Sequence, residues 1–216
     1  MPPGSVILPH ANLRATAAPR PKTRPRAAPL VIPMPKATPA YRHTFHVLSA
    51  HPEVTDRYDA IILEQAARRA MDPRLIKAII AAESEFSNAA LSPRGARGLM
   101  QILPATAEEL GVARKNLSDP EANIRAGTAY LARLHEAAWK RYRLKGVGYR
   151  DAPLWVVQRI IAAYNAGPRA LNRDRWMRQT RNYVRKVLLF YRSDVSEFRL
   201  SHMRTGSSLP RADTLP

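Results

Sequence analysis

Asp72-Pro-Arg-Leu-Ile-Lys-Ala-Ile-Ile-Ala-Ala-Glu-Ser-Glu-Phe86 opens the stretch that decides the fold, and after a polar turn it continues as Gly95-Ala-Arg-Gly-Leu-Met-Gln-Ile-Leu-Pro-Ala-Thr106. Asp72 can cap a helix, and the proline that follows suits the first helical position. The residues up to Phe86 therefore predict a helix of about four turns. The glycines after it predict a change of direction.

One carboxylate of this helix lies where apolar residues lie. Ile76, Ile79, Ile80 and Glu83 follow one another at the spacing of a core-facing stripe, whereas Glu85 falls on the opposite side, toward water. A carboxylate on an apolar face costs free energy unless it is protonated or hydrogen-bonded. Desolvation should raise its pKa, which suits a general acid. A structural carboxylate that binds loop amides or an arginine fits the same position, so both readings stay open here.

A tight loop follows the helix. Ser92, Pro93, Gly95 and Gly98 are turn formers and predict that the chain returns close to the end of the helix. Glycine also permits the close approach of a backbone to a ligand or to another segment. The loop and the end of the helix are therefore expected to lie together.

Four ordered segments resemble the soluble lytic transglycosylase (SLT) domain, and together they cover roughly residues 55 to 195. Four motifs in order are far more specific than one short pattern. They comprise Glu83-Ser84 with Phe86, Ser92, Gly95-Ala96, Gly98-Leu99-Met100-Gln101, Pro104 and Thr106-Ala107; Asp119-Pro120, Asn123-Ile124, Gly127 and Tyr130-Leu131; Ala163-Tyr164-Asn165-Ala166-Gly167-Pro168; and Thr180, Asn182-Tyr183-Val184 and Val187.

This resemblance implies an all-α, lysozyme-like domain that binds peptidoglycan glycan strands and cuts between N-acetylmuramic acid and N-acetylglucosamine. It implies that Glu83 protonates the leaving oxygen and then takes the proton of the C6 hydroxyl, with help from the substrate's acetamido group. A 1,6-anhydro ring closes and no water is consumed, so the enzyme is a lyase. The resemblance implies no cofactor.

Most glycosidases use two carboxylates, so a second one matters. Glu85 faces away from Glu83 on the same helix, Glu108 and Glu109 lie on an amphipathic helix and are expected to be solvated, and Asp119 is better explained as a helix cap. The residues offer no convincing partner. A single-carboxylate route, as the resemblance implies, avoids the need for one.

Four further residues are candidates for binding the substrate, and each has a plainer reading. Ser92 either lies near the acid and the acetamido group, as in the family, or simply forms the turn. Gln101 can bind sugar amides or pin the loop by hydrogen bonds. Tyr164 continues an apolar stripe, yet the family places its hydroxyl near the acid. Asn165 can bind sugar or cap the end of its helix.

The rest of the chain predicts further helices and no strand. We expect residues 1–52 to be a disordered Pro/Arg/Ala-rich tail, residues 53–198 the catalytic domain, and residues 199–216 a flexible C-terminal tail. Helices are expected from Thr55 or Asp56 to Ala70, from Pro104 to Gly111, from Pro120 to about Tyr142, from Pro153 to Gly167, and from about Arg178 to Tyr191.

Charge and composition restrict the partners. The formal net charge of +18 attracts polyanions. Helix-turn-helix, zinc-ligand and aromatic RNA-binding patterns are not recognisable, so we expect no specific nucleic acid. A solvated basic surface and weak attraction to anionic envelope polymers both stay open. The chain has no cysteine. Its six histidines are scattered and read as surface residues, so we predict no metal.

The setting is expected to be the bacterial cell envelope or periplasm, because peptidoglycan lies there. No apolar run approaches the roughly 20 residues of a transmembrane helix, and Val6-Ile7-Leu8 is too short for a signal-peptide core, so the export route stays open. The proline-rich tail can bind a groove on a secretion-system, phage or envelope partner. Rival readings are a hydrolase like the goose-type lysozymes, a non-catalytic wall-binding or assembly module, and a nucleic-acid binder favoured by charge alone.

Overall fold

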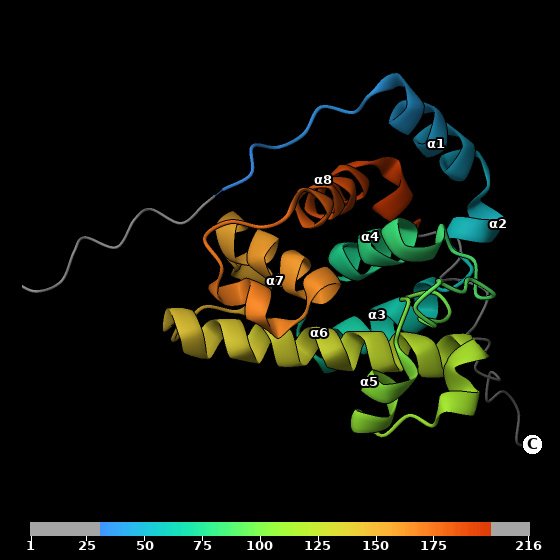
Figure 1. Ribbon diagram of the computed structural model, residues 1–216. Helices are drawn as coiled ribbons and strands as arrows, with labels where there is room; N and C mark the ends of the chain where they lie inside the picture. The colour runs from blue at the N-terminus through green and yellow to red at the C-terminus, as the bar shows by residue number, and fades with distance from the viewer. Residues whose placement is uncertain (1–30, 200–216) are drawn as a thin grey trace, which may run out of the picture.

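The computed structural model describes residues 31–199, which form a bundle of helices (Figure 1). The α-helices are α1 (Pro39–Ala50), α2 (Pro52–Thr55), α3 (Asp59–Arg68), α4 (Pro73–Ser84), α5 (Pro104–Glu109), α6 (Pro120–Tyr142), α7 (Leu154–Ala166) and α8 (Arg178–Arg192). Short 3-10 turns are η1 (Arg114–Ser118), η2 (Tyr149–Asp151), η3 (Pro168–Asn172) and η4 (Asp194–Ser196). Within residues 31–199 extended pairing is limited to isolated bridges, so the predicted all-α fold is confirmed.

Side-chain caps start the two helices that frame the site. The Asp72 carboxylate accepts a hydrogen bond from the backbone N–H of Arg74 at 2.9 Å, and Asp119 accepts from Ala122 at 2.7 Å. A cap of this kind satisfies a backbone donor that has no partner inside the helix. Both caps were predicted from the sequence and are confirmed.

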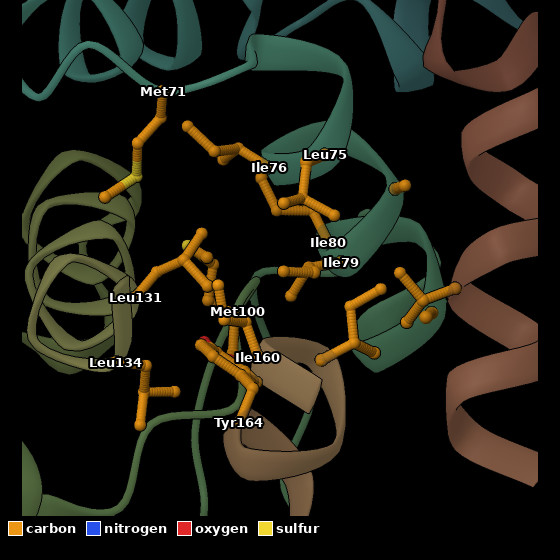
Figure 2. Close-up of a cluster of buried hydrophobic side chains, with 14 of the residues drawn as sticks. Met71, Leu75, Ile76, Ile79, Ile80, Met100, Leu131, Leu134, Ile160 and Tyr164 are labelled. Atoms are coloured by element: carbon orange, nitrogen blue, oxygen red, sulfur yellow. The ribbon is translucent and has the colours of Figure 1, made fainter. Parts of the chain in front are cut away.

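Helix α4 lies at the centre of the bundle, and residues 75–82 along it are buried. Figure 2 shows Ile76 and Ile79 of α4 facing Leu131 of α6 and Ile160 of α7, with Met100 between the helices. Helix α8 packs along another side of α4. Burial of each such side chain contributes about 1.5–3 kcal/mol, so the orientation of α4 is strongly determined.

The N-terminal residues differ from the expected tail. Residues 1–30 and 200–216 lie outside the described residues, but residues 39–50 form α1 and not irregular chain. The ring of Phe45 packs edge-on against Phe190 of α8, with 5.2 Å between ring centroids. The apolar side chains of this segment can therefore pack against the bundle. The proline-rich composition of the N-terminal residues did not indicate this contact.

The helix expected from Thr55 or Asp56 to Ala70 is divided in two. Residues 52–55 form the short helix α2, and α3 begins at Asp59 and ends at Arg68. Ala70 has a φ of 51°, which no α-helical residue adopts. The helix therefore stops before Ala70, and Met71 turns into the core with 1% of its surface exposed.

His135 is an exception to the expectation that the histidines lie at the surface. It is buried on α6, and its Nδ1 lies 2.8 Å from the carbonyl oxygen of Leu131. Its ring packs against Trp139 and Tyr149, and burial lowers its pKa. The position four residues after Leu131 places it on the inner stripe of the helix, a signal that the sequence contained. None of the helices in residues 31–199 combines the length and apolar character needed to cross a bilayer.

Candidate active site

Glu83 lies in the last turn of α4. The helix ends at Ser84, two residues earlier than predicted, because Glu85 and Phe86 have positive φ angles of 49° and 66°. The Ser84 hydroxyl donates to the carbonyl oxygen of Leu99 at 2.8 Å. This contact joins the end of the helix to the glycine-rich loop, as predicted, and leaves the Glu83 side chain partly buried between them.

Two side chains from α8 contact the C-terminal end of α4, where Glu83 lies. The Tyr183 hydroxyl donates to Glu83 Oε1 at 2.6 Å. The Lys186 ammonium donates to the carbonyl oxygen of Ala82 at 2.6 Å, where the helix leaves backbone acceptors without an internal partner. No residue in the described part of the chain hydrogen-bonds to Glu83 Oε2, so one carboxylate oxygen is held and the other is available to a ligand.

Burial dominates the electrostatics of this carboxylate. It raises the pKa of the Glu83 carboxyl from 4.5 to about 7, while the Tyr183 hydrogen bond and the charge of Lys186 act in the opposite direction. Burial also raises the pKa of Tyr183 well above 10, so its hydroxyl remains a donor. Near neutral pH Glu83 therefore populates both protonation states, which is the property required of a group that gives and then takes a proton.

The loop opposite Glu83 is held by a buried asparagine on α6. Asn123 accepts from the backbone N–H of Met100 at 2.9 Å and donates to the carbonyl oxygens of Arg97 and Leu117, each at 2.9 Å. Gly98 lies directly against it with a φ of 73°, and a Cβ atom there would come within 2.8 Å of the Leu117 carbonyl oxygen. The loop can therefore approach α6 only with glycine at this position.

These elements enclose an open cleft of about 410 Å³. All five residues predicted for the site line it, although they come from α4, the loop and α7. The residues around the cleft are Glu83, Ser92, Arg94, Ala96, Gln101, Ile102, Leu103, Thr106, Tyr130, Tyr164, Asn165 and Gly167. Among them Glu83 is the sole carboxylate and Arg94 the sole cation, and Glu108 and Glu109 are exposed elsewhere, on α5.

The turn and loop-pinning readings of Ser92 and Gln101 are both observed. The Ser92 hydroxyl accepts from the backbone N–H of Ala96 at 3.0 Å and closes the turn. The Gln101 amide nitrogen donates to the carbonyl oxygens of Ala90 and Gly98, at 3.1 and 3.0 Å. Both side chains still line the cleft, and no described residue donates a hydrogen bond to the amide oxygen of Gln101, so a polar surface remains for a ligand.

Tyr164 and Asn165 end α7 at the cleft. The buried Tyr164 donates its hydroxyl to the Met100 carbonyl oxygen at 2.9 Å, and its ring packs on Tyr130 at 5.4 Å between centroids. The hydroxyl that hydrogen-bonds to Glu83 belongs to Tyr183, whereas Tyr164, which the family resemblance places near the acid, lines the same cleft. Asn165 is exposed inside the helix and Gly167 occupies the cap, so the capping role for Asn165 is wrong.

Three contributors were given no role from the sequence, although Tyr183 and Asn123 are among the residues that resemble the SLT domain. Tyr183 is 100 residues from Glu83, but it follows Thr180 by three residues and precedes Val187 by four, which places its hydroxyl on the buried stripe of α8. Asn123 belongs to a motif of the SLT resemblance, but nothing in the sequence indicated that its side chain holds the loop. Arg94 lies between the turn formers Pro93 and Gly95, and the sequence indicated only a turn there. Within residues 31–199 no three His, Cys, Asp or Glu side chains converge on a metal-sized site.

Fold and site together define an all-helical domain whose cleft contains one partly buried carboxylate, Glu83. The model of the transglycosylase SLT domain family matches residues 60–188, and the chain belongs to this family. The match starts just after the beginning of α3 and ends within α8, so it contains every residue that lines the cleft.

Similar proteins carry the same domain within longer chains. The membrane-bound lytic murein transglycosylase F of Desulfosudis oleivorans is 38% identical over 111 residues, which are 51% of this chain and 22% of that protein. The protein of the same name from Yersinia enterocolitica is 36% identical over 127 residues, 59% of this chain and 24% of its own. The 70 kDa soluble lytic transglycosylase SLT70 of Escherichia coli has the same fold, with a TM-score of 0.50 and 24% identity over 69% of this chain and 28% of its own. This chain thus spans about a quarter of the length of these relatives.

Proposed function

We propose that this domain is a peptidoglycan lytic transglycosylase in which Glu83 acts first as the acid and then as the base. The observation that carries the proposal is a single carboxylate, partly buried at an open cleft, with its pKa raised to about 7. Membership of the SLT family and the lytic murein transglycosylases among its relatives support the substrate class.

The proposed reaction balances without water. Protonated Glu83 donates through Oε2 to the glycosidic oxygen as the bond from C1 of N-acetylmuramic acid to that oxygen breaks. The resulting carboxylate then accepts the proton of the C6 hydroxyl while O6 bonds to C1. The products are an N-acetylglucosamine end and a 1,6-anhydro end, and Glu83 is again protonated. General acid–base catalysis of this kind contributes about 10²–10⁴ in rate.

The surroundings of Glu83 suit both half-reactions. Desolvation favours the protonated acid, and the Tyr183 hydrogen bond and Lys186 charge stabilise the carboxylate that follows. Tyr183 also holds Oε1, so that Oε2 faces the substrate in a fixed direction. A group with a pKa near the working pH transfers protons efficiently in both directions.

The remaining lining residues are proposed to bind the sugars. The amide oxygen of Gln101 and the exposed side chain of Asn165 can accept from and donate to acetamido groups. Ser92 presents its hydroxyl at the same rim, and Tyr164 with Tyr130 supplies an aromatic wall. Proximity of these groups to Glu83 in one cleft supports their assignment as the substrate site.

The strongly basic chain is proposed to work in the bacterial cell envelope, where peptidoglycan and other anionic polymers lie. Relatives named as membrane-bound transglycosylases support this setting. Partners of the N-terminal residues in a secretion system, a phage or the envelope belong to the same proposal.

Digestion of purified sacculi tests the activity. We expect soluble fragments with 1,6-anhydro ends in the mass spectrum from the wild-type protein and none from Glu83→Gln, because an amide cannot donate and then accept the proton. Reducing ends in place of anhydro ends would assign a lysozyme-like hydrolase. Release of anhydro fragments by Glu83→Gln at the wild-type rate would overturn the catalytic assignment. Glu85→Gln, two residues away and exposed, is the matched control.

A further inference from the structure

Residues 31–38, here called the strap, run in an extended conformation along the helical bundle before α1 begins (Figure 1). Ile32 is only 4% exposed and joins the hydrophobic core. Its backbone N–H donates to the side-chain oxygen of Gln158 at 2.7 Å, and its carbonyl oxygen accepts from the Gln158 amide nitrogen at 2.7 Å. Gln158 is fully buried in the middle of α7.

This pairing copies the way in which one β-strand recognises another. A single amide side chain satisfies both backbone groups of one extended residue, and the hydrophobic core takes the side chain of that residue. Recognition of an extended peptide commonly combines these two parts, main-chain hydrogen bonds for affinity and a pocket for specificity. Without an occupant the buried amide of Gln158 would lose its partners, which is costly. The site is therefore built for a peptide.

The strap is anchored narrowly. Val31 is 45% exposed and Pro33 is exposed, so Ile32 alone is deeply held in this stretch. The proline that follows the anchor has no N–H to satisfy and favours the extended conformation of the residue before it. Met34, which is partly buried against the core, adds a shallower contact. One deep anchor, one shallow contact and two hydrogen bonds make a small interface, and we expect it to open without unfolding the helices.

The strap also lies outside the part of the chain that matches the SLT family, which begins at residue 60. Residues 1–30, which precede it, are rich in proline and contain only basic charges. A partner that binds these residues gains access to the strap, because Val31 alone separates them from Ile32. A partner bound to residues 1–30 would therefore lie next to the site, where its own segment could compete with the strap.

We propose that the Gln158 groove is a recognition site for an extended peptide with a branched apolar residue followed by proline. The strap occupies it within the chain, and a segment of the same chemistry from a partner protein takes its place when the strap leaves. Tethering gives the strap an effective concentration on the order of millimolar, so a free peptide binds weakly while the strap is docked.

Fluorescence anisotropy on full-length protein tests the proposal. The probe is a labelled peptide of residues 31–38, Val-Ile-Pro-Met-Pro-Lys-Ala-Thr. Ile32→Asp removes the strap from the pocket because a carboxylate does not enter an apolar site. We expect this variant to bind the probe at least tenfold more tightly than the wild type. Adding Gln158→Leu should weaken the binding at least tenfold, since both hydrogen bonds are lost. A probe with aspartate at the anchor should not bind.

A second measurement leaves the strap intact and so does not depend on how Ile32→Asp folds. The chain has no cysteine, so a spin label or dye can be attached to Val31→Cys alone. Excess unlabelled peptide should increase the mobility of this label. A label at Leu91→Cys, exposed and remote in the loop beside the cleft, is the control and should not respond.

Three results would overturn the proposal. The first is that the probe binds the wild type and Ile32→Asp equally well. The second is that Gln158→Leu does not weaken binding of the probe. The third is that saturating peptide does not change the mobility of the label at Val31→Cys. Sedimentation of the wild-type protein decides between sources of the peptide. A monomer is expected, whereas a concentration-dependent dimer abolished by Gln158→Leu would assign the groove to the strap of a second copy and reject the partner protein.

Discussion

The raised pKa of Glu83 makes the acid a cost to the fold at neutral and alkaline pH. In the unfolded chain the carboxyl ionises with a pKa near 4.5, whereas in the folded protein it ionises near 7. The fold therefore favours the protonated form. This favourable contribution is complete below the unfolded pKa and is lost as the pH rises through the folded pKa. A shift from 4.5 to about 7 corresponds to roughly 3 kcal/mol of unfolding free energy at most.

Glu83→Gln removes this dependence, because the amide is neutral at every pH and its oxygen can still accept the Tyr183 hydrogen bond. We expect the variant and the wild type to unfold with similar free energies at pH 4. At pH 8 the variant should be more stable, by about 1–3 kcal/mol. Urea titrations followed by circular dichroism at both pH values measure the difference.

The matched control is Glu85→Gln, which neutralises an exposed carboxylate at the same helix end. Solvent screens exposed charges, so this variant should change stability little at either pH. If the stability of Glu83→Gln relative to the wild type were the same at pH 4 and pH 8, burial would not raise the pKa of the Glu83 carboxyl. The acid-then-base mechanism would then lose its electrostatic basis.

Two further variants, each with a control variant, test the residues that hold the site in place. Tyr183→Phe removes the hydrogen bond that lowers the pKa of Glu83, so the alkaline limb of the pH–rate profile should move to higher pH while the maximal rate falls about tenfold. Tyr191→Phe, which removes a hydroxyl bonded to Asp72 on the same helix, should leave that limb in place. Gly98→Ala should destabilise the fold by about 2 kcal/mol or more in urea titrations, because its Cβ meets the Leu117 carbonyl. Gly111→Ala shares a positive φ in open space and should cost less, and equal losses would contradict the clash.

Local signals in the sequence were sufficient for the starts of α4 and α6 and for the inward direction of Glu83, but not for α1 or for the division between α2 and α3. Asp72 and Asp119 satisfy backbone donors within three residues of themselves, so their caps depend on nothing distant. The stripe of Ile76, Ile79 and Ile80 is likewise a local pattern. Such features can be predicted because the atoms that cause them are close in the chain.

Features that depend on distant partners could not be predicted in this way. The early end of α4 depends on Phe86, which adopts a positive φ and turns its ring into the core. The contact of Tyr183 with Glu83 requires α8 to cross α4 at one register. Burial of Gln158 is explained only by Ile32, 126 residues away. In each case the residue type allowed several positions and tertiary packing selected one.

Buried polar residues outside the cleft fix the two helices that carry the site. On α4, six residues before Glu83, Lys77 is fully buried and its ammonium contacts Asp56 at 3.0 Å, Asp59 at 2.7 Å and the carbonyl oxygen of Glu197 at 2.8 Å.

On α7, Gln158 lies six residues before Tyr164 and holds the strap. The partners of Lys77 are Asp56, Asp59 and Glu197, and all three lie outside the SLT match. The strap, which is the partner of Gln158, lies outside it too. Loss of a partner from a buried ammonium or amide costs free energy, so each of these contacts opposes sliding of its helix along the helix axis. Every residue that lines the cleft lies inside the SLT match, whereas the register of two helices that form it is also fixed by residues outside that match.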